Sequence, residues 1–386
     1  MTDLSVGVVG CGVISATYLD YMPSFAGVKI VACTDIIPER SAEKAAKHGI
    51  DAVTPEEMMK RDDVHIILNI TPPQAHFEVD QAALSAGKHV FSEKPLCVEP
   101  DHGPRLVSEA QKRGLTIGCA PDTFLGAGGR LAREIVDSGK IGRVVAGSCN
   151  LMSRGMEHWH PDPRAFYQRG GGPLFDVGPY YLNALINLLG PIESVVGLTS
   201  SAFPSRHVTA DGPLKGQHIP VGTPTTLMGV LRFACGADIN LFMSWDVWKH
   251  GHPPIELYGT EGSLRVPDPN FFGGAVEYSE RNGDWIAVDS GDRAFGRPNY
   301  RSASWPASAP MRANYRCLGV AELASAVQNG TPHRASLALG AHAVEAMHAV
   351  LASGADGGAV RLRSAIARPA ALDETSAAAL WAGGWR

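Results

Sequence analysis

A glycine-rich turn near the start of the chain has the residue spacing of a dinucleotide-binding site. It runs from Gly10 to Ser15 as Gly-Cys-Gly-Val-Ile-Ser, with serine where the G-x-G-x-x-G/A fingerprint usually has glycine or alanine. Gly10 permits a sharp turn, and Gly12 lets the backbone approach a pyrophosphate at a helix N-terminus. Because a strand-like run precedes the turn and a helical pattern begins near Ile14, we predict a dinucleotide site to which Val13 and Ile14 also contribute. An ordinary glycine turn is the alternative.

An acidic residue after the next apolar run favours NAD over NADP. Asp35 follows the glycines by roughly 20 residues, where a carboxylate accepts hydrogen bonds from ribose hydroxyls and repels a 2′-phosphate. The nearest cation is Arg40, and no arginine directly follows Asp35. We therefore predict NAD as the cofactor, with Arg40 at the edge of its site. A helix-capping role for Asp35 is the alternative.

Glu93 and Lys94 stand at the end of another apolar run and are followed by Pro95. A charged pair at the end of a buried strand is costly unless it has a partner or a task. Partial desolvation lowers the pKa of an ammonium group toward neutrality, as proton transfer requires. We expect Glu93 to orient Lys94, and a surface lysine near a turn is the alternative. The sequence leaves open whether the bond before Pro95 is cis.

A second glycine-rich segment, Gly170 to Gly178, contains Asp176, and Tyr180 follows four residues after it. This spacing predicts that Asp176 and Tyr180 share one helix face. A phenol can donate or accept a hydrogen bond, but its ordinary pKa near 10 makes it a poorer base than imidazole. The alternative role for Asp176 is that of a helix N-cap.

Aromatic residues with polar neighbours precede this segment and suit the faces and hydroxyls of a carbohydrate. These candidate substrate contacts are Trp159, His160, Arg164 and Tyr167. Asp122, near the expected domain junction, is a further candidate for which a structural role fits equally well. The His158-x-His160 spacing alone does not define a metal site, and we predict none.

The first part of the chain alternates between strand and helix patterns, which predicts a parallel sheet covered on both faces. Predicted strands are Leu4–Val9, Val28–Thr34, Val64–Ile70, His89–Ser92 and Leu115–Cys119. Predicted helices begin near Ile14 and cover Ile36–Ile50, Gln74–Ala86 and Pro104–Arg113. We therefore predict an N-terminal Rossmann domain over residues 1–121.

The pattern after about Pro121 changes to longer strands with turn residues between them, which predicts a mostly antiparallel open sheet. Its predicted strands are Arg143–Leu151, Ile192–Thr199, Thr226–Phe233, Asp238–Val247, Ile255–Gly259 and Ser263–Val266. Predicted helices are Gly129–Ser138, Gly178–Leu189, Tyr315–Asn329 and Ala338–Ser353. We predict a C-terminal α/β domain over residues 122–386, so that the fold class combines α/β with α+β.

Composition excludes several other classes of protein. A chain of 386 residues is longer than a single hydrophobic core usually supports, so we expect two domains. Its content of 45% hydrophobic and 19% charged residues is typical of a globular protein. With a net charge of −5 and scattered lysines and arginines, no nucleic-acid partner is expected. No secretion signal or membrane-length apolar run is apparent, so we expect a cytoplasmic protein. Seven cysteines without a Cys-x-x-Cys pair predict no disulfide framework or zinc knuckle.

Four motifs in order resemble one family, that of glucose–fructose oxidoreductase, inositol dehydrogenase and rhizopine catabolism proteins (Gfo/Idh/MocA). They are the Gly10–Ser15 turn, Ile70-Thr71-Pro72-Pro73 with His76, Glu93-Lys94-Pro95, and Gly170–Gly178. The resemblance spans nearly the whole chain. It implies a nicotinamide cofactor across the ends of the parallel strands, in a site that we expect the second and third motifs to line. Those residues are Ile70, Thr71, Pro72, His76, Glu93 and Lys94.

The resemblance also implies a reaction, namely hydride exchange with a ring carbon of a sugar, glycoside or cyclitol. It assigns Lys94 to the substrate hydroxyl, as general base in oxidation or general acid in reduction, and it places Asp176 at the substrate. Many members have histidine where this chain has Tyr180, so the proton relay departs from the family pattern here. The family further implies a homodimer or homotetramer formed through one face of the antiparallel sheet.

Two other functions occur on similar proteins. One is an NAD-dependent glycosidase, which oxidises a ring carbon transiently and regenerates a tightly bound cofactor. The other is a non-catalytic sensor of sugar or dinucleotide. Retention of Glu93, Lys94, Pro95 and Asp176 argues against the sensor. A sugar or polyol dehydrogenase is therefore the leading expectation.

Overall fold

In a computed structural model, which describes residues 3–302, 305 and 307–385, contacts group the chain into two units. Unit 1 contains residues 1–125, 315–344 and 370–386, and unit 2 contains residues 126–314 and 345–369. The predicted domain border after residue 121 lies near the first of these divisions. Residues 315–344 and 370–386, however, group with unit 1, whereas the predicted second domain included them.

Unit 1 is built on a six-stranded parallel sheet with the order β3-β2-β1-β4-β5-β6. Its strands are β1 Leu4–Val9, β2 Val28–Thr34, β3 Asp51–Ala52, β4 Ile66–Asn69, β5 His89–Ser92 and β6 Ile117–Cys119. Residues such as Val6, Ile67 and Phe91 are fully buried, because helices cover both faces of a parallel sheet. The strand order reverses between β1 and β4, and ligands bind beyond the carboxyl ends of strands at such a point. The predicted Rossmann fold is confirmed.

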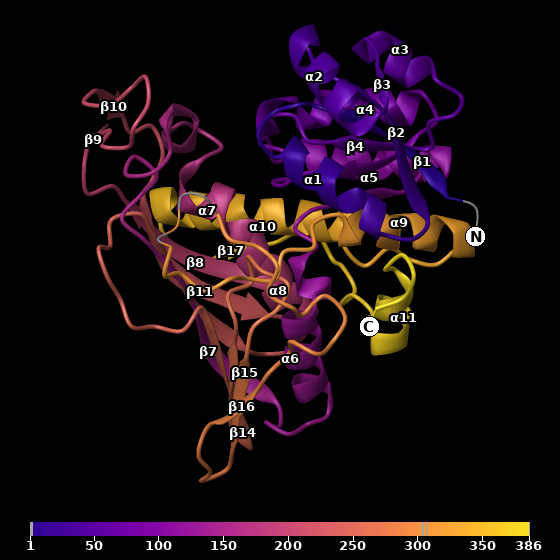
Figure 1. Cartoon of the computed structure of the whole chain (residues 1–386). Helices are drawn as coiled ribbons and strands as arrows, with labels where there is room; N and C mark the ends of the chain where they lie inside the picture. Colours follow the sequence, from indigo (N-terminus) through magenta and orange to yellow (C-terminus); the bar gives the residue numbers. More distant parts are fainter. Residues whose placement is uncertain (1–2, 303–304, 306, 386) are drawn as a thin grey trace. The chain divides into compact units, whose positions relative to one another are not determined.

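The helices of unit 1 begin and end at residues suited to those positions. They are α1 Ser15–Tyr21, α2 Pro38–His48, α3 Pro55–Lys60, α4 His76–Ser85, α5 His102–Arg113, α9 Leu318–Asn329 and α11 Glu374–Ala379. A capping box between Thr54 and Glu57 begins α3, and Gly49 and Gly114 end α2 and α5 in the left-handed conformation. Figure 1 shows α2, α3 and α4 around the strands of this sheet.

The two later segments of unit 1 pack against its first segment. A Cβ on Gly319, in α9, would lie 2.6 Å from the Phe91 ring, so the helix approaches β5 as closely as glycine permits. The Trp381 ring meets Phe25 and Tyr315 edge to face, at centroid distances of 5.3 and 5.8 Å. The Ala26 N–H also donates to the carbonyl oxygen of Leu380 over 2.9 Å. Side-chain packing and backbone hydrogen bonds therefore explain why these segments belong to unit 1.

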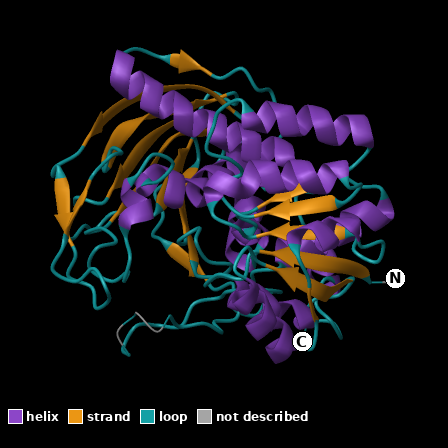
Figure 2. Ribbon diagram, turned by 90° about the horizontal axis from the view of Figure 1, so that it is seen from above, coloured by secondary structure: helices purple, strands orange, loops and turns teal. Residues whose placement is uncertain are grey.

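Unit 2 is built on a nine-stranded sheet with the order β16-β15-β14-β13-β7-β12-β11-β8-β17. Its strands are β7 Val144–Met152, β8 Ile192–Ser200, β11 Thr226–Phe233, β12 Asp238–Ser244, β13 Ile255–Gly259, β14 Gly262–Val266, β15 Val276–Glu280, β16 Ile286–Val288 and β17 Val360–Arg361. Neighbouring strands are antiparallel except for the parallel pair β7 and β12. The predicted mostly antiparallel sheet is confirmed, and Figure 2 shows its curvature.

Helices cover one face of this sheet and leave apolar side chains on the other. The helices are α6 Ala127–Asp137, α7 Gly172–Asp176, α8 Gly178–Leu189 and α10 Leu337–Asp356, the last of which begins in unit 1. Every residue of α8 is buried, and α8 contacts β7. On the open sheet face, which we define by Val196 and Leu198 in β8 and Met228 and Val230 in β11, all four side chains are exposed. Leu198 is opposite Met228 and Val196 opposite Val230.

A short antiparallel hairpin, β9 Ser205–His207 and β10 His218–Pro220, lies outside the main sheets. Together with Met156, Tyr167 and Trp245 it encloses a small separate hydrophobic core. Among the described residues, no helix has the length and apolarity needed to cross a bilayer.

Candidate functional site

The two glycines of the first turn have different structural roles. Gly10 has φ +101°, and a Cβ there would lie 2.8 Å from the carbonyl oxygen of Ile70. The turn after β1 therefore packs directly on the backbone that leaves β4. A Cβ on Gly12 would have no atom within 4 Å, so its backbone faces open space just before α1. Open backbone at a helix N-terminus fits the phosphate-binding role predicted from the sequence.

Asp35 is held beside this turn by two backbone hydrogen bonds. Its Oδ2 accepts from the N–H of Cys11 over 2.7 Å, and its Oδ1 accepts from the N–H of Ile37 over 2.8 Å. The residue that caps α2 is Ile37, with no side-chain cap bond, so Asp35 is not the helix cap itself. The carboxylate is thus fixed at the end of β2, where its oxygens can accept hydrogen bonds from ribose hydroxyls.

Exposed apolar side chains flank the glycines and the carboxylate. Val13 is 96% exposed and Ile36 is 89% exposed, which is unusual for side chains of this size. Arg40 is also exposed, on α2. Uncovered apolar surface beside a fixed carboxylate and an open helix N-terminus suits the base, ribose and phosphates of a dinucleotide, so these residues fit an NAD molecule.

The segment that leaves β4 is fixed by a buried polar pair that the sequence analysis did not identify. The Nδ2 of Asn69 donates to Asp80 Oδ1 over 2.7 Å and to the His76 carbonyl oxygen over 3.1 Å. Its Oδ1 accepts from the Thr71 hydroxyl over 2.7 Å. Burial raises the pKa of Asp80 to about 7. These bonds hold the backbone around Ile70, Thr71 and Pro72, the predicted cofactor contacts.

His76 joins the ends of β4 and β5 and does not present its side chain to a ligand. It is fully buried, with Nδ1 2.8 Å from the carbonyl oxygen of Pro95 and Nε2 2.8 Å from that of Thr71. Burial lowers its pKa, and a neutral imidazole has one N–H, which serves one carbonyl at a time. The family resemblance implied that His76 contacts the cofactor, whereas in the structure its side chain supports the segments that carry Thr71 and Lys94.

Glu93 and Lys94 follow β5 and interact through the backbone. One carboxylate oxygen of Glu93 accepts from the Tyr18 hydroxyl over 2.8 Å, and the other accepts from the Lys94 N–H over 2.8 Å. Glu93 is buried and Lys94 is half-buried, so Lys94 is not the surface lysine of the alternative interpretation. The bond between Lys94 and Pro95 is cis. Glu93 thus fixes the main chain of Lys94, and its partner Tyr18 lies 75 residues away in sequence, too far for a motif to predict.

Asp122 has a structural partner. Its carboxylate is 2% exposed and accepts from the Gly319 N–H over 2.6 Å, in the first turn of α9. Burial raises its pKa to about 6, and the charge of Arg316 opposes that rise. A carboxylate at a helix N-terminus is favourably placed. Of the two roles considered from the sequence, the structure therefore supports the structural one, and Asp122 does not present a free carboxylate to a substrate.

Asp176 and Tyr180 lie on two consecutive helices of unit 2. Asp176 is the last residue of α7, Tyr180 lies in the first turn of α8, and Val177 separates the helices. The cap residue of α8 is Val177, so both the single helix and the N-cap role of Asp176 are wrong. Asp176 is half-buried and Tyr180 is buried. Lys94 belongs to unit 1, so the three predicted catalytic residues come from both units.

The predicted aromatic contacts differ strongly in exposure. Trp159 is 49% exposed and meets half-buried His160 edge to face at 5.5 Å. Arg164 is exposed but is paired with Asp162, with N–O distances of 2.6 and 2.8 Å. Trp159 and His160 therefore keep surfaces that a sugar ring can contact, whereas the guanidinium of Arg164 is already committed to a neighbouring carboxylate.

Tyr167 is a core residue and not a substrate contact. Its side chain is fully buried, its ring meets Trp245 edge to face at 5.4 Å, and its hydroxyl is hydrogen-bonded to Glu157. Glu157 also pairs with buried Arg206 over 3.3 Å, and Arg206 pairs with Asp246. No sequence motif predicts this cluster, because Arg206 and Asp246 lie far along the chain from Glu157 and Tyr167. Among the described residues, no group of three or more His, Cys, Asp and Glu side chains forms a metal site.

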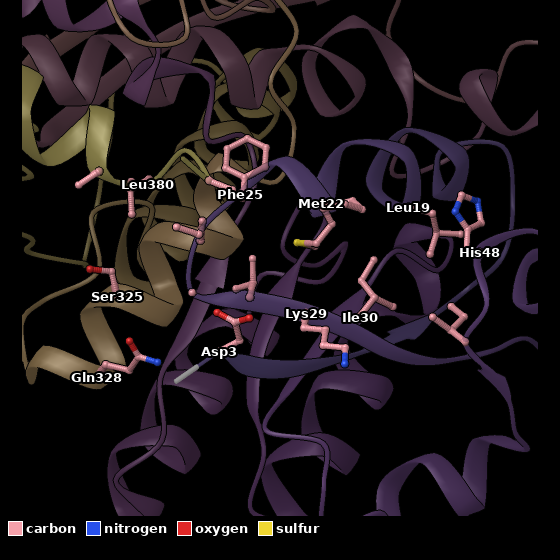
Figure 3. Close-up of a pocket in the computed structure, with 18 of the residues that line it drawn as sticks. Asp3, Leu19, Met22, Phe25, Lys29, Ile30, His48, Ser325, Gln328 and Leu380 are labelled. Atoms are coloured by element: carbon pink, nitrogen blue, oxygen red, sulfur yellow. The ribbon is translucent and has the colours of Figure 1, made fainter. Parts of the chain in front are cut away.

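A pocket of about 910 Å³ lies in unit 1 at the amino-terminal ends of β1 and β2 (Figure 3). Its lining includes Leu19, Met22, Phe25, Lys29 and Leu380. The glycine-rich turn follows the opposite, carboxyl end of β1. This pocket is therefore separate from the predicted dinucleotide site.

Comparison with known proteins identifies related sequences over most of the chain. A family profile described as "Oxidoreductase family, NAD-binding Rossmann fold" matches residues 4–120. A second, described as "GFO/IDH/MocA C-terminal domain", matches residues 130–265. The two profiles, an N-terminal and a C-terminal domain, follow each other along the chain as far as residue 265.

Individual relatives include sugar and cyclitol dehydrogenases. Levoglucosan dehydrogenase of Pseudarthrobacter phenanthrenivorans is 26% identical over 292 residues, which cover 68% of this chain and 73% of that protein. Inositol 2-dehydrogenase of Ralstonia nicotianae is 26% identical over 303 residues, covering 75% and 81%. The solved structure of levoglucosan dehydrogenase in complex with NADH and levoglucosan has a TM-score of 0.77 at 22% identity, covering 94% of this chain and all of that one. The last similarity concerns the fold.

Proposed function

Because the chain belongs to the Gfo/Idh/MocA family of NAD-binding oxidoreductases, we propose that it transfers hydride between NAD and a ring carbon of a sugar, glycoside or cyclitol. The main support is the arrangement at the carboxyl ends of β1, β2, β4 and β5. There the open glycine turn, the fixed carboxylate of Asp35 and the anchored backbone of Lys94 all occur within unit 1. Relatives named for action on levoglucosan and inositol support the substrate class.

The residues proposed to hold the cofactor lie on the turn after β1 and on the segments after β2 and β4. They are Gly10, Gly12, Val13, Ile14, Asp35, Ile70, Thr71 and Pro72. Bound NAD supplies the hydride acceptor in oxidation, and NADH the donor in reduction. The carboxylate of Asp35, already oriented by Cys11 and Ile37, would accept hydrogen bonds from ribose hydroxyls and disfavour the phosphate of NADP.

Lys94 carries the proposed proton transfer. In oxidation its uncharged amine accepts the proton of the substrate hydroxyl at Nζ, and in reduction its ammonium returns that proton. Asp176 and Tyr180 are proposed to bind substrate hydroxyls, with Trp159 and His160 against the sugar face. Since a tyrosine replaces the histidine of many members, Lys94 is the principal proton acceptor in this proposal.

The test of this function is NADH formation by purified protein with NAD or NADP and a panel of sugars, glycosides and cyclitols. We expect one substrate class to give stoichiometric NADH, and Lys94→Ala to lower kcat by about 100-fold or more, the usual scale of general-base loss. Lys112→Ala, which changes an exposed lysine on α5, is the matched control and should keep full activity. Absence of NADH formation, with NAD retained on the purified protein, would favour the glycosidase with a recycled cofactor.

We also propose that the protein forms a homo-oligomer through the open sheet face. Four apolar side chains lie in adjacent cross-strand positions there, and Leu198 alone is 73% exposed. A contiguous apolar patch on a sheet is typical of a protein interface. The family resemblance supports a dimer or a tetramer.

A further inference from the structure

We propose that Tyr18 is a positioning residue for Lys94, which it ties through Glu93 to the helix that follows the glycine-rich turn. Tyr18 lies on α1, three residues after the first helical residue, Ser15, and therefore within the first turn. The proposal rests on the proposed function, in which Lys94 transfers the proton. It assigns to Tyr18 no contact with substrate or cofactor.

The Tyr18 hydroxyl points to Glu93 and donates a hydrogen bond to its carboxylate. The side chain is fully buried, and its hydroxyl donates to Glu93 Oε1 over 2.8 Å. Burial raises the pKa of Tyr18 well above its usual value, so the phenol stays protonated and acts as a donor. A buried carboxylate requires such donors, because each loss leaves charge poorly solvated. Tyr18 therefore holds the Glu93 side chain in one orientation.

Glu93 transmits this constraint to the main chain of Lys94. Its second oxygen accepts from the Lys94 N–H over 2.8 Å. On the other side of Lys94, the carbonyl oxygen of Pro95 lies 2.8 Å from His76 Nδ1. Buried side chains thus anchor the backbone both before and after Lys94. Removal of the Tyr18 hydroxyl leaves the His76 anchor in place and loosens only the one formed by Glu93.

The connection matters because oxidation needs Lys94 at the hydroxyl oxygen, which loses the proton, while the cofactor lies at the carbon bearing that hydroxyl, which loses the hydride. The turn from Gly10 to Gly12 is proposed to hold the cofactor, and α1 begins directly after it. Tyr18 therefore gives the cofactor-binding helix and Lys94 a shared fixed point. A displacement of about 1 Å at a reacting group can cost up to 100-fold in rate.

The first experiment compares Tyr18→Phe with the wild-type protein at saturating NAD and sugar. We expect kcat to fall about 10-fold, while KM for both substrates stays within about twofold, because orientation is affected more than binding. Tyr278→Phe is the matched control, since Tyr278 is also a buried tyrosine whose hydroxyl accepts from Lys140. Activity is expressed per folded molecule from urea unfolding curves. An unchanged kcat in Tyr18→Phe overturns the proposal.

A double-mutant cycle tests whether Tyr18 acts through Glu93. Glu93→Ala removes both hydrogen bonds, so adding Tyr18→Phe to it should lower kcat no further. Losses that multiply in the double variant would mean that Tyr18 acts by another route, which overturns the proposal. Glu93→Gln keeps an oxygen for the Lys94 N–H and an amide that can donate to Tyr18, so it should recover most of the kcat lost in Glu93→Ala.

A measurement independent of catalysis separates this proposal from the proposed function. Hydrogen–deuterium exchange of a peptide covering residues 92–97 should be faster in Tyr18→Phe than in the wild type or Tyr278→Phe, since the Lys94 N–H loses its fixed acceptor. Faster exchange with no dehydrogenase activity in any variant would reject the function of Lys94 and keep the positioning role. Unchanged exchange would reject the positioning role even in an active enzyme.

Discussion

Asp80 is a fully buried carboxyl group whose ionisation works against the folded state. Burial raises its pKa to about 7, and the hydrogen bond from Asn69 only partly offsets this. Because the folded pKa lies above the unfolded value, the stability contributed by the protonated form is fully present below about pH 4. It is lost as pH rises through the folded value, so ionised Asp80 weakens the fold most above pH 7. The same residue supports the segment that carries Thr71.

We therefore predict that Asp80→Asn becomes more stable relative to the wild type as pH rises. The asparagine keeps an oxygen for Asn69 and cannot ionise, so the stability difference should grow by about 1 to 3 kcal/mol between pH 5 and pH 7 and then level off. Urea unfolding at several pH values measures it. A difference that is constant with pH would contradict the raised pKa.

Single side chains could be predicted where their role depends on neighbours in sequence, and not where it depends on distant partners. The position of Asp35 at the end of β2 could be predicted, because the local strand and turn determine it. His76, Asp122 and Tyr167 are polar residues near the expected site, but their side chains are buried against Pro95, Gly319 and Glu157, respectively. Such pairings arise only once the chain is folded.

At the scale of elements, the turn between β1 and α1 makes opposite demands on its two glycines. Gly10 needs its left-handed backbone and its close contact with the Ile70 carbonyl, whereas Gly12 has free space around it. We predict that Gly12→Ala keeps the wild-type unfolding midpoint but binds NAD at least about 10-fold more weakly, because the methyl group obstructs the pyrophosphate. Gly10→Ala should lose about 1 to 3 kcal/mol of stability.

Thermal unfolding and NAD titration by calorimetry distinguish these two effects. The Gly10 variant serves as the comparison, since its loss of binding should accompany a loss of folding. If Gly12→Ala bound NAD as tightly as the wild type, the phosphate site would have to lie elsewhere than at this turn.

Elements with a clear apolar pattern could be predicted from sequence to within a few residues. Strands β2 and β11 and helix α8 have the bounds predicted, because each is a mainly apolar segment between turn residues. The hairpin strands β9 and β10 have three residues each, too few for a period to be visible. Helix α11 lies in an alanine-rich stretch whose packing partner, the Phe25 region, is distant in sequence. Its position depends on tertiary contacts.

At the scale of the whole molecule, the open sheet face makes a prediction about assembly. If two copies associate through it, Leu198→Glu places charge among Val196, Met228 and Val230 and should shift the protein toward monomers at micromolar concentration. Met311→Glu is the control, since Met311 is an exposed apolar side chain outside the sheet. Light scattering after size exclusion measures the mass. A monomeric wild type, or equal masses for both variants, would contradict this assembly.

The division of unit 1 among three stretches of chain has a consequence for its biosynthesis. The ribosome makes residues 126–314 of unit 2 before the α9 segment that receives Asp122 and packs on Phe91. Part of the apolar surface of the unit 1 sheet therefore stays uncovered while residues 126–314 are translated. Unit 1 can become complete only after those residues have been synthesised. We therefore expect a gene fragment encoding only the first 121 residues to yield an aggregation-prone product, because the apolar surface that α9 covers stays exposed in it.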